Sequence, residues 1–269
     1  MRLQDCPREI TAHPGSRETS YFKTGGSVSD ITLAGAATAE HWYYINGVDV
    51  LSASSGALVA FGDSITDGRG STTNGNDRWP DQLAVRLAKY PATREIGVLN
   101  QGIGGNRLLH DGLGPNGLAR FDRDVLAQTG VRWVILLEGI NDLGTAAAAR
   151  SRGEPAAVPG DIIAADQQLI IRAHAHGIRI YGATLTPFEG FKTYDSPRAQ
   201  QDRQAINHWI RTSGEFDGVI DFDAILRDPA HPLRLQLGAD SGDHLHPSVA
   251  GYRAMAQAVD LGLFEPLDP

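Results

Sequence analysis

The stretch Ala57-Leu-Val-Ala-Phe-Gly-Asp-Ser-Ile-Thr-Asp-Gly68 decides the fold of this chain. Its first five residues are apolar, and a run of this length is typical of a strand that is buried on both faces. Gly62, Asp63 and Ser64 follow at once, and residues of these types favour turns. In open parallel sheets, ligands bind beyond the carboxyl ends of the strands. We therefore expect the polar turn at Gly62–Ser64 to lie at the edge of the sheet where a ligand would bind.

Short apolar runs and longer amphipathic stretches alternate along the rest of the chain. Further buried strands are expected at Gly97–Leu99, Val131–Leu137, Ile178–Ala183 and Val219–Ile220. Helices are expected at Trp79–Lys89, Leu118–Ala127, Ile162–His176, Ala199–Thr212 and Pro247–Val259. Pro247 is placed in the first turn of the last helix, where proline is favoured. This alternation predicts a parallel sheet that helices cover on both faces.

Residues 1–55 have a different pattern. Aromatic and β-branched residues stand between glycines in Ser20–Gly26 and His41–Val50, which predicts short strands and hairpins. Ser52–Gly56 is typical of a short linker. We therefore divide the chain into a β-rich N-terminal segment, residues 1–55, and a second domain, residues 56–269.

The composition excludes several classes of protein. Among 269 residues, 24 are Lys or Arg and 32 are Asp or Glu, and the net charge is −8. No basic run interrupts this balance, so nucleic acid is a poor candidate partner. The apolar runs are too short to span a bilayer. Cys6 is alone, which excludes an internal disulfide framework. The opening residues lack the apolar stretch of a signal peptide, so we expect a cytoplasmic chain as written and leave an exported parent protein open.

Polar, glycine-containing segments follow the first three strands of the second domain and precede its last helix. They are Gly62–Gly68, Asn100–Arg107, Glu138–Asp142 and Asp240–Pro247. Together they supply the parts that acyl transfer to a serine needs. A hydroxyl is a weak nucleophile until a base removes its proton, and the base needs an orienting carboxylate.

Ser64 is the candidate nucleophile and His246 the candidate base. Asp243 stands three positions before His246, a spacing that a turn can fold so that the carboxylate reaches the imidazole. The negative charge of a tetrahedral intermediate needs fixed donors. We expect these to be the amide N–H groups of Ser64 and Gly105 and the side-chain NH₂ of Asn141. Gly105 suits this role because a side chain there would block the approach of the backbone to a substrate.

These segments together resemble the GDSL-type SGNH hydrolases. Gly62-Asp-Ser-Ile65 matches the first block of that family, Gly105 the second, Asn141 the third and Asp243-His-Leu-His-Pro247 the fifth, in the family's order. The resemblance covers about residues 57–262. It implies a three-layer α/β/α sandwich with a short, mostly parallel sheet, of the flavodoxin-like kind. It also implies that the chain is a serine esterase, which hydrolyses esters through an acyl-enzyme intermediate and needs no cofactor. Residues 1–55 lie outside the resemblance and are interpreted as the remnant of an accessory β domain.

Other interpretations of the same residues stay open. Gly62–Ile65 and Gly104-Gly105 also fit plain turns, and Asn141 and Asp142 fit a helix cap. Asp243, His244 and His246 have the residue types of metal ligands, but no fourth ligand is indicated. As whole-chain alternatives we keep a non-catalytic carbohydrate-binding protein, or within the enzymes a lysophospholipase or thioesterase. Asp142 is expected to brace its loop.

The loops near the candidate site combine many polar side chains with few apolar ones. The polar set is Arg69, Asn74, Asp77, Arg78, Asn106, Arg107, Glu189 and Lys192, and the apolar set is Ile65, Leu108, Phe188 and Leu245. This mixture favours small acyl groups, acetyl to butyryl, and a polar alcohol such as a carbohydrate. As substrate-binding candidates we name Asp63, Ile65, Asn106, Arg107, Phe188 and Leu245. The pattern does not indicate the alcohol itself or the oligomeric state.

The base sets the expected pH dependence. Activity should rise as His246 loses its proton, with a pKa near the ordinary value of about 6.5. An ionised Asp243 beside it is expected to raise that pKa.

Overall fold

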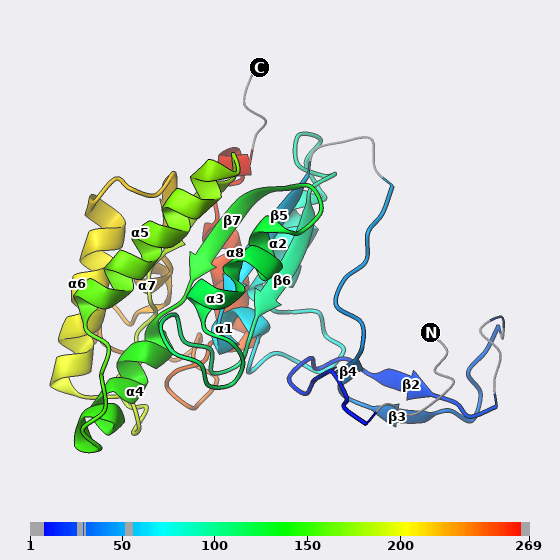
Figure 1. Cartoon of the computed structure of the whole chain (residues 1–269), viewed down its shortest axis with the longest axis horizontal. Coiled ribbons are helices and arrows are strands. Elements are labelled where there is room, and N and C mark those ends of the chain that lie inside the picture. The colour runs from blue at the N-terminus through cyan, green and yellow to red at the C-terminus, as the bar shows by residue number, and fades with distance from the viewer. Residues whose placement is uncertain (1–7, 26–28, 30, 52–55, 265–269) are drawn as a thin grey trace.

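The computed structural model describes residues 8–25, 29, 31–51 and 56–264. Its centre is a five-stranded sheet of order β6-β5-β7-β8-β9 (Figure 1). These strands are Ala57–Gly62 (β5), Gly97–Gly102 (β6), Val131–Leu137 (β7), Arg179–Ala183 (β8) and Gly218–Ile220 (β9). All neighbouring pairs are parallel, which confirms the predicted sheet. The carboxyl ends of the strands therefore meet at one edge.

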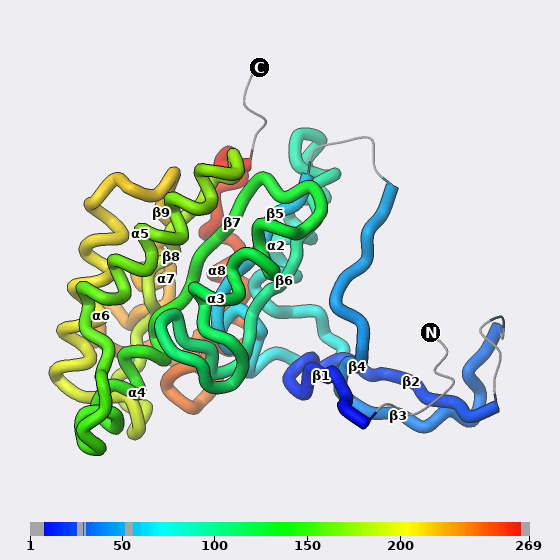
Figure 2. The backbone as a smooth tube through the Cα atoms, in the orientation of Figure 1, coloured from blue at the N-terminus to red at the C-terminus, as the bar shows by residue number. Residues whose placement is uncertain are grey.

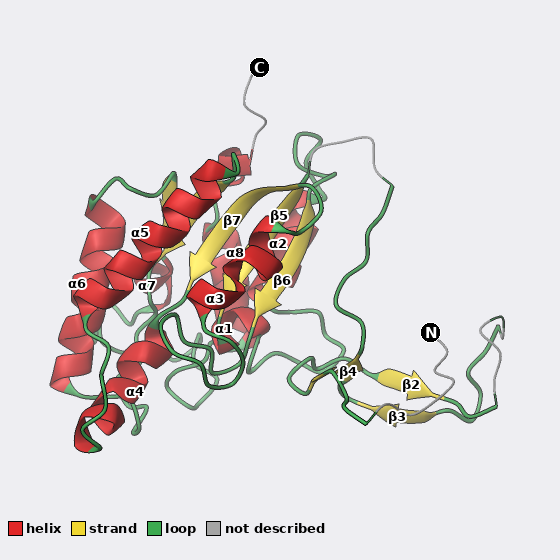
Figure 3. Cartoon of the chain, viewed as in Figure 1, coloured by secondary structure: helices red, strands yellow, loops and turns green. Residues whose placement is uncertain are grey.

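Helices lie on both sides of this sheet, as predicted (Figure 3). The long ones are Trp79–Leu87 (α2), Ile140–Ser151 (α4), Pro159–Ala175 (α5), Pro197–Thr212 (α6) and Val249–Ala258 (α8). The short ones are Ser64–Asp67 (α1), Gly117–Phe121 (α3), Phe222–Leu226 (α7), a π-helical turn at Asp122–Leu126 and a 3₁₀ turn at Leu261–Phe264. Helix α8 packs against α2 and α7, and α5 against α3 and α6. All six residues of β5 are buried between these layers.

Two helix predictions need correction, and one long helix has no counterpart among the predictions. Helix α8 begins at Val249 after the N-cap Ser248, so Pro247 precedes the helix and is not in its first turn. The stretch predicted as one helix at 118–127 is α3 followed by the π-helical turn. Helix α4 was not predicted, because its run of small alanines has little amphipathic period and its N-cap, Gly139, offers no side-chain signal.

The described part of residues 1–55 holds four short strands. Ala12–His13 (β1) pairs with Trp42–Tyr43 (β4), and Ser20–Phe22 (β2) pairs with Ala37–Ala39 (β3), both antiparallel. Figure 2 shows them beside the main body, toward the edge at which the sheet strands end. Most of the predicted linker Ser52–Gly56 lies outside the described residues. In the described ranges, no helix has the length and apolar character that a membrane crossing requires.

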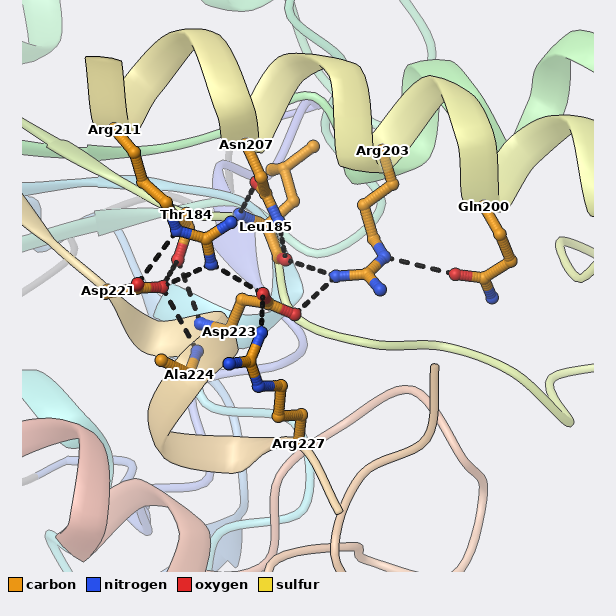
Figure 4. Close-up of polar contacts among 10 residues, drawn as sticks. All are labelled: Thr184, Leu185, Gln200, Arg203, Asn207, Arg211, Asp221, Asp223, Ala224 and Arg227. Atoms are coloured by element: carbon orange, nitrogen blue, oxygen red, sulfur yellow. Dashed lines mark hydrogen bonds and ion pairs between the residues drawn. The ribbon is translucent and has the colours of Figure 1, made fainter. Parts of the chain in front are cut away.

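A buried ionic network fastens α6 to α7 and to the end of β8 (Figure 4). Asp223 is 4% exposed, and its two carboxylate oxygens lie 2.6 Å from Arg203 and 2.6 Å from Arg211. Arg203 also donates to the carbonyl of Leu185, 3.1 Å away, in the loop after β8. Removing one partner of such a pair leaves the other charge buried without compensation.

We therefore expect Asp223→Asn to lower the free energy of unfolding by about 3–5 kcal/mol, because Arg203 stays buried. The control is Glu154→Gln, since Glu154 and Arg152 form an ion pair in which both side chains are more than half exposed. That change should cost less than about 1 kcal/mol. Denaturant titrations give both values. Equal losses in the two variants would contradict this account of the network.

Candidate active site

Ser64 stands at the end of the central strand β5. The carboxylate of Asp63 caps α1 by accepting a hydrogen bond from the amide of Ile65, 2.8 Å away, and this holds Ser64 in the first turn. Gly62 makes the turn possible, because a Cβ there would lie 2.3 Å from the hydroxyl of Thr66 and 2.5 Å from the carbonyl of Leu137. The turn therefore places Ser64 at the carboxyl edge of the sheet.

The Asp240–Pro247 loop brings a histidine and a carboxylate to this serine. Ser64 Oγ lies 2.8 Å from His246 Nε2, although the two residues are 182 positions apart. His246 Nδ1 lies 2.6 Å from Asp243 Oδ2. Asp243 Oδ1 also accepts hydrogen bonds from the amides of His246 and Leu245, at 2.8 and 3.0 Å. Three side chains named from the sequence thus form one hydrogen-bonded line.

His244 takes no part in this line. Its Nδ1 lies 2.6 Å from Asp240 Oδ2, so it forms a second histidine–aspartate pair, in which the His244 side chain is 55% exposed. Its left-handed backbone, with φ of +67°, turns the chain between the two histidines. In the described ranges, no group of three or more histidine, cysteine, aspartate or glutamate side chains is arranged to hold a metal ion.

The loop after β6 brings Gly105 to the same edge. Its φ of +72° is unfavourable for other residues, and a Cβ there would lie 2.7 Å from Leu113 Cδ1. The positive φ therefore favours glycine at this position, a different reason from the close approach of substrate that the sequence suggests. Neither the amide of Gly105 nor that of Ser64 donates to another described residue.

Asn141 lies in the first turn of α4, after the N-cap Gly139, so it is not a helix cap. Its Nδ2 donates to the carbonyl of Asn106, 2.7 Å away, and its Oδ1 accepts from the hydroxyl of Tyr194, 2.8 Å away. These two bonds fix the orientation of the amide and leave one N–H of the NH₂ group for another acceptor.

Sequence reasoning missed Tyr194, which lies in a loop far from the motifs. The one sign of it is Gly144 inside helix α4, where a Cβ would lie 2.2 Å from the Tyr194 ring. A glycine within a helix marks a close approach of this kind.

Asp142 braces the loop that carries Gly105. Its two carboxylate oxygens accept hydrogen bonds from the amides of Leu108 and Leu109, at 2.7 and 3.0 Å. Sequence reasoning also missed the buried Arg120, which donates to the carbonyl of Gly62 and the Oδ1 of Asn106, at 2.9 and 2.8 Å. The same loop is therefore tied both to α4 and to the end of β5.

The predicted substrate-binding residues divide into two groups. Four of them are at most 1% exposed: Asp63, Ile65, Asn106 and Phe188. They leave no surface for a substrate, so their assignment to direct binding is corrected: they support the loops from within. Arg107 is half-buried and Leu245 is 3% exposed, and for these two substrate contact stays a prediction.

Burial sets the direction of the titrations at the site. It lowers the pKa of His246 and outweighs the neighbouring Asp243, which acts in the opposite sense. The sequence-based expectation of a raised pKa is therefore wrong. Burial alone would raise the pKa of Asp243, but the hydrogen bonds from the amide and ring of His246 lower it below its usual range. Burial raises the pKa of Asp63 to about 7, and raises the pKa of Glu138 and Asp166 well above the usual range.

Comparisons with known proteins identify a family and solved structures of the same fold. The model of the GDSL-like lipase/acylhydrolase family matches residues 60–254. No curated protein matches the chain. A variant of the acetyl xylan esterase Axe2 from Geobacillus stearothermophilus is similar at 26% identity, over 80% of this chain and 98% of that one, with a TM-score of 0.57.

Two other solved structures share the fold. A lipase/acylhydrolase from Enterococcus faecalis is 19% identical over 76% of this chain and 93% of that one, with a TM-score of 0.56. A GDSL-like lipase from Bacteroides thetaiotaomicron is 18% identical over 77% and 87%, with a TM-score of 0.55.

The raised pKa of Asp63 predicts a pH-dependent stability. The folded state holds this proton up to about pH 7, whereas the unfolded chain loses it near 3.8, so the contribution of Asp63 to stability falls as the pH rises between these values. An asparagine at this position cannot ionise and keeps an oxygen for the helix cap. Relative to wild type, Asp63→Asn should therefore gain roughly 2–4 kcal/mol of stability between pH 4 and pH 8.

Urea titrations across this range measure the difference. The control is Asp49→Asn, because Asp49 is exposed. A constant difference for Asp63→Asn would show that this carboxyl ionises normally.

Proposed function

The chain belongs to the GDSL-like lipase/acylhydrolase family and is a carboxylic ester hydrolase, and on this premise we propose that it cleaves esters of small acyl groups through an acyl-enzyme on Ser64. The observation that carries the proposal is the line from Ser64 Oγ to His246 Nε2, 2.8 Å, and from His246 Nδ1 to Asp243 Oδ2, 2.6 Å. A hydroxyl, an imidazole and a carboxylate in this order form an activated nucleophile.

The first half of the reaction makes the acyl-enzyme. His246 takes the proton from Ser64 as Oγ attacks the carbonyl carbon, and Asp243 stabilises the imidazolium that forms. The new oxyanion accepts hydrogen bonds from the amides of Ser64 and Gly105 and from the remaining N–H of Asn141. The C–O bond to the alcohol then breaks, and the alcohol leaves with the proton from His246.

The second half releases the acid. A water gives its proton to His246 and attacks the acyl carbon, through the same oxyanion donors. The bond to Ser64 Oγ breaks and the serine recovers its proton from His246.

The acyl range, acetyl to butyryl, rests on the small apolar area at the site. Leu108 and Phe188 are fully buried in the core and offer no face to an acyl chain. Leu113 is 71% exposed and lies against Gly105, so it supplies apolar surface beside the oxyanion donors. One leucine suits a short chain better than a long one. The similarity to an acetyl xylan esterase supports a carbohydrate ester as the substrate. Lysophospholipid and thioester substrates are the alternatives that the assays must separate.

Alanine variants test the catalytic line. Ser64→Ala and His246→Ala should each lower kcat by about 10⁴–10⁶ on 4-nitrophenyl acetate, because the nucleophile or its base is lost. His244→Ala is the matched control: its side chain is 55% exposed and pairs with Asp240 outside the catalytic line, so the loss should stay below about tenfold. Circular dichroism checks that the variants fold. If His244→Ala proves the more damaging variant, the base is misassigned.

The pH profile tests the environment of the base. Only neutral His246 accepts the serine proton, so kcat/KM should rise with pH, and its acidic limb should have a midpoint below about 6.5 because burial lowers the pKa. Asp243→Asn removes the group that raises this pKa, so the midpoint should move still lower as the rate falls. A midpoint above 7 in the wild type would contradict the assigned environment.

A series of 4-nitrophenyl esters tests the acyl range. We expect kcat/KM to be highest for acetate to butyrate and to fall for decanoate and longer chains, because little apolar surface receives them. Lysophosphatidylcholine and acetyl thioesters are measured in parallel. A maximum at long chains or at the lysophospholipid would refute the small-acyl proposal and leave the catalytic line untouched.

A further inference from the structure

Three neighbouring strands of the sheet end at the same level of its carboxyl edge. Gly62, the last residue of β5, is paired with Gly102 at the end of β6 and with Leu137 at the end of β7. Because these strands are parallel and in register, the segments that follow them leave the sheet side by side. Ser64 lies in the segment after β5, and Asn141 lies in the segment after β7. The nucleophile and the side-chain donor therefore start from adjacent strand ends.

The next strand, β8, supplies a tyrosine to the same edge. Strand β8 pairs with β7, and Tyr194 lies in the loop that follows β8. Its hydroxyl donates to Asn141 Oδ1, 2.8 Å away. The nitrogen of the same amide donates to the carbonyl of Asn106, 2.7 Å away, in the loop that carries Gly105. The Asn141 amide, only 3% exposed as a residue, is therefore held between the loops after β6 and β8.

The ring of Tyr194 is fixed from three sides. It packs against Gly144 of α4, where a Cβ would lie 2.2 Å from the ring. The ring of Phe191 meets it edge to face, with 5.0 Å between the centroids, and the amide of Tyr194 donates to the carbonyl of Phe191, 2.9 Å away. Glycine is a poor helix former, so its place inside α4 is explained by the room that the ring needs. Burial raises the pKa of the Tyr194 hydroxyl, which therefore stays protonated and remains a donor at neutral pH.

The orientation of the Asn141 amide decides whether it can stabilise an oxyanion. In the observed orientation, Oδ1 is used by Tyr194 and one N–H by Asn106, and the second N–H is left for the oxyanion. An amide turned through 180° would bring Oδ1 against the carbonyl oxygen of Asn106 and would present an oxygen to the oxyanion in place of the N–H. The hydroxyl of Tyr194 opposes this turn. By donating to Oδ1 it also polarises the amide, which strengthens the N–H as a donor.

We propose that Tyr194 is a positioning residue for the reaction, whose hydroxyl holds and polarises the Asn141 amide so that its free N–H meets the oxyanion. The inference rests on the proposed function and adds to it a residue from a loop outside the four glycine-containing segments. In this role Tyr194 acts through Asn141 and needs no contact with the substrate. Its loss therefore lowers the rate of the chemical steps and leaves substrate binding intact.

Tyr194→Phe removes the hydroxyl and keeps the ring. We expect kcat on 4-nitrophenyl acetate to fall about three- to tenfold, the factor that one neutral hydrogen bond contributes. KM should stay within about twofold, because both halves of the reaction pass through the same oxyanion site. The matched control is Tyr181→Phe, which loses a hydroxyl that donates to the carbonyl of Leu263 in the C-terminal 3₁₀ turn, and its kcat should equal that of wild type. Circular dichroism checks that both variants fold.

A double-mutant cycle then shows whether Tyr194 acts through Asn141. Asn141→Ala alone should lower kcat by about 10²–10³, the usual loss for one oxyanion donor. With the acceptor of its hydrogen bond gone, adding Tyr194→Phe should change kcat by less than about twofold, because the two residues act as one unit. If Tyr194 had only a structural role, Tyr194→Phe would lower kcat by the same factor in both backgrounds.

The outcomes separate this inference from the proposed function. An unchanged kcat in Tyr194→Phe, a change confined to KM, or equal factors in the two backgrounds overturns the inference, while hydrolysis of 4-nitrophenyl acetate that depends on Ser64 upholds the esterase. A wild-type kcat in Asn141→Ala also overturns it, because Asn141 then serves no oxyanion. Activity that survives Ser64→Ala would overturn the proposed function, and this inference with it.

Discussion

The buried guanidinium of Arg120 is the interaction on which the site depends. Its side chain is fully buried, and it donates to the carbonyls of Gly62 and Gln101 at the ends of β5 and β6, at 2.9 and 2.8 Å. A third bond reaches Asn106 Oδ1 at 2.8 Å. Burying an arginine costs much free energy unless its N–H groups are hydrogen-bonded and a carboxylate balances its charge. Here the balancing carboxylate is that of Asp124, 3.1 Å away. Arg120 thereby fixes the ends of β5 and β6 and the loop of Gly105 relative to one another.

Several acidic side chains are buried near this arginine, and their burial favours the protonated, uncharged form. Asp63 and Glu138 lie deep in the protein, and Glu138 Oε1 is 3.8 Å from Arg120. One cation cannot balance several buried anions, so burial raises the pKa of Asp63 and Glu138, and both can keep a proton near neutral pH. Asp243 faces the opposite situation, because three hydrogen bonds from the Leu245–His246 turn stabilise its charge. The same residue type thus holds its proton to a higher pH where it caps α1, and its pKa is lowered where it pairs with His246.

The active site is assembled from layers that are fixed independently. Helix α4 places Asn141 and Asp142, while the loop before α8 places Asp243 and His246. At the far end of the sheet, the network around Asp223 holds α6, α7 and the end of β8. Each layer has its own polar anchor, and at the edge where the layers meet Ser64 Oγ lies 2.8 Å from His246 Nε2 and His246 Nδ1 lies 2.6 Å from Asp243 Oδ2.

The sequence alone predicts the parallel sheet, most of its helices and the three residues Ser64, His246 and Asp243 that form the hydrogen-bonded line. These follow from local patterns: apolar runs of strand length, and an aspartate three positions before a histidine, which a single turn brings together. The residues that support the neighbouring loops emerge only in the folded chain. Tyr194 bonds to Asn141, 53 positions away, and Arg120 to Asn106, 14 positions away, and no local pattern specifies such contacts. The direction of the His246 pKa also belongs to the tertiary structure, because burial of the imidazole is a property of the packed layers and not of its neighbours in the chain.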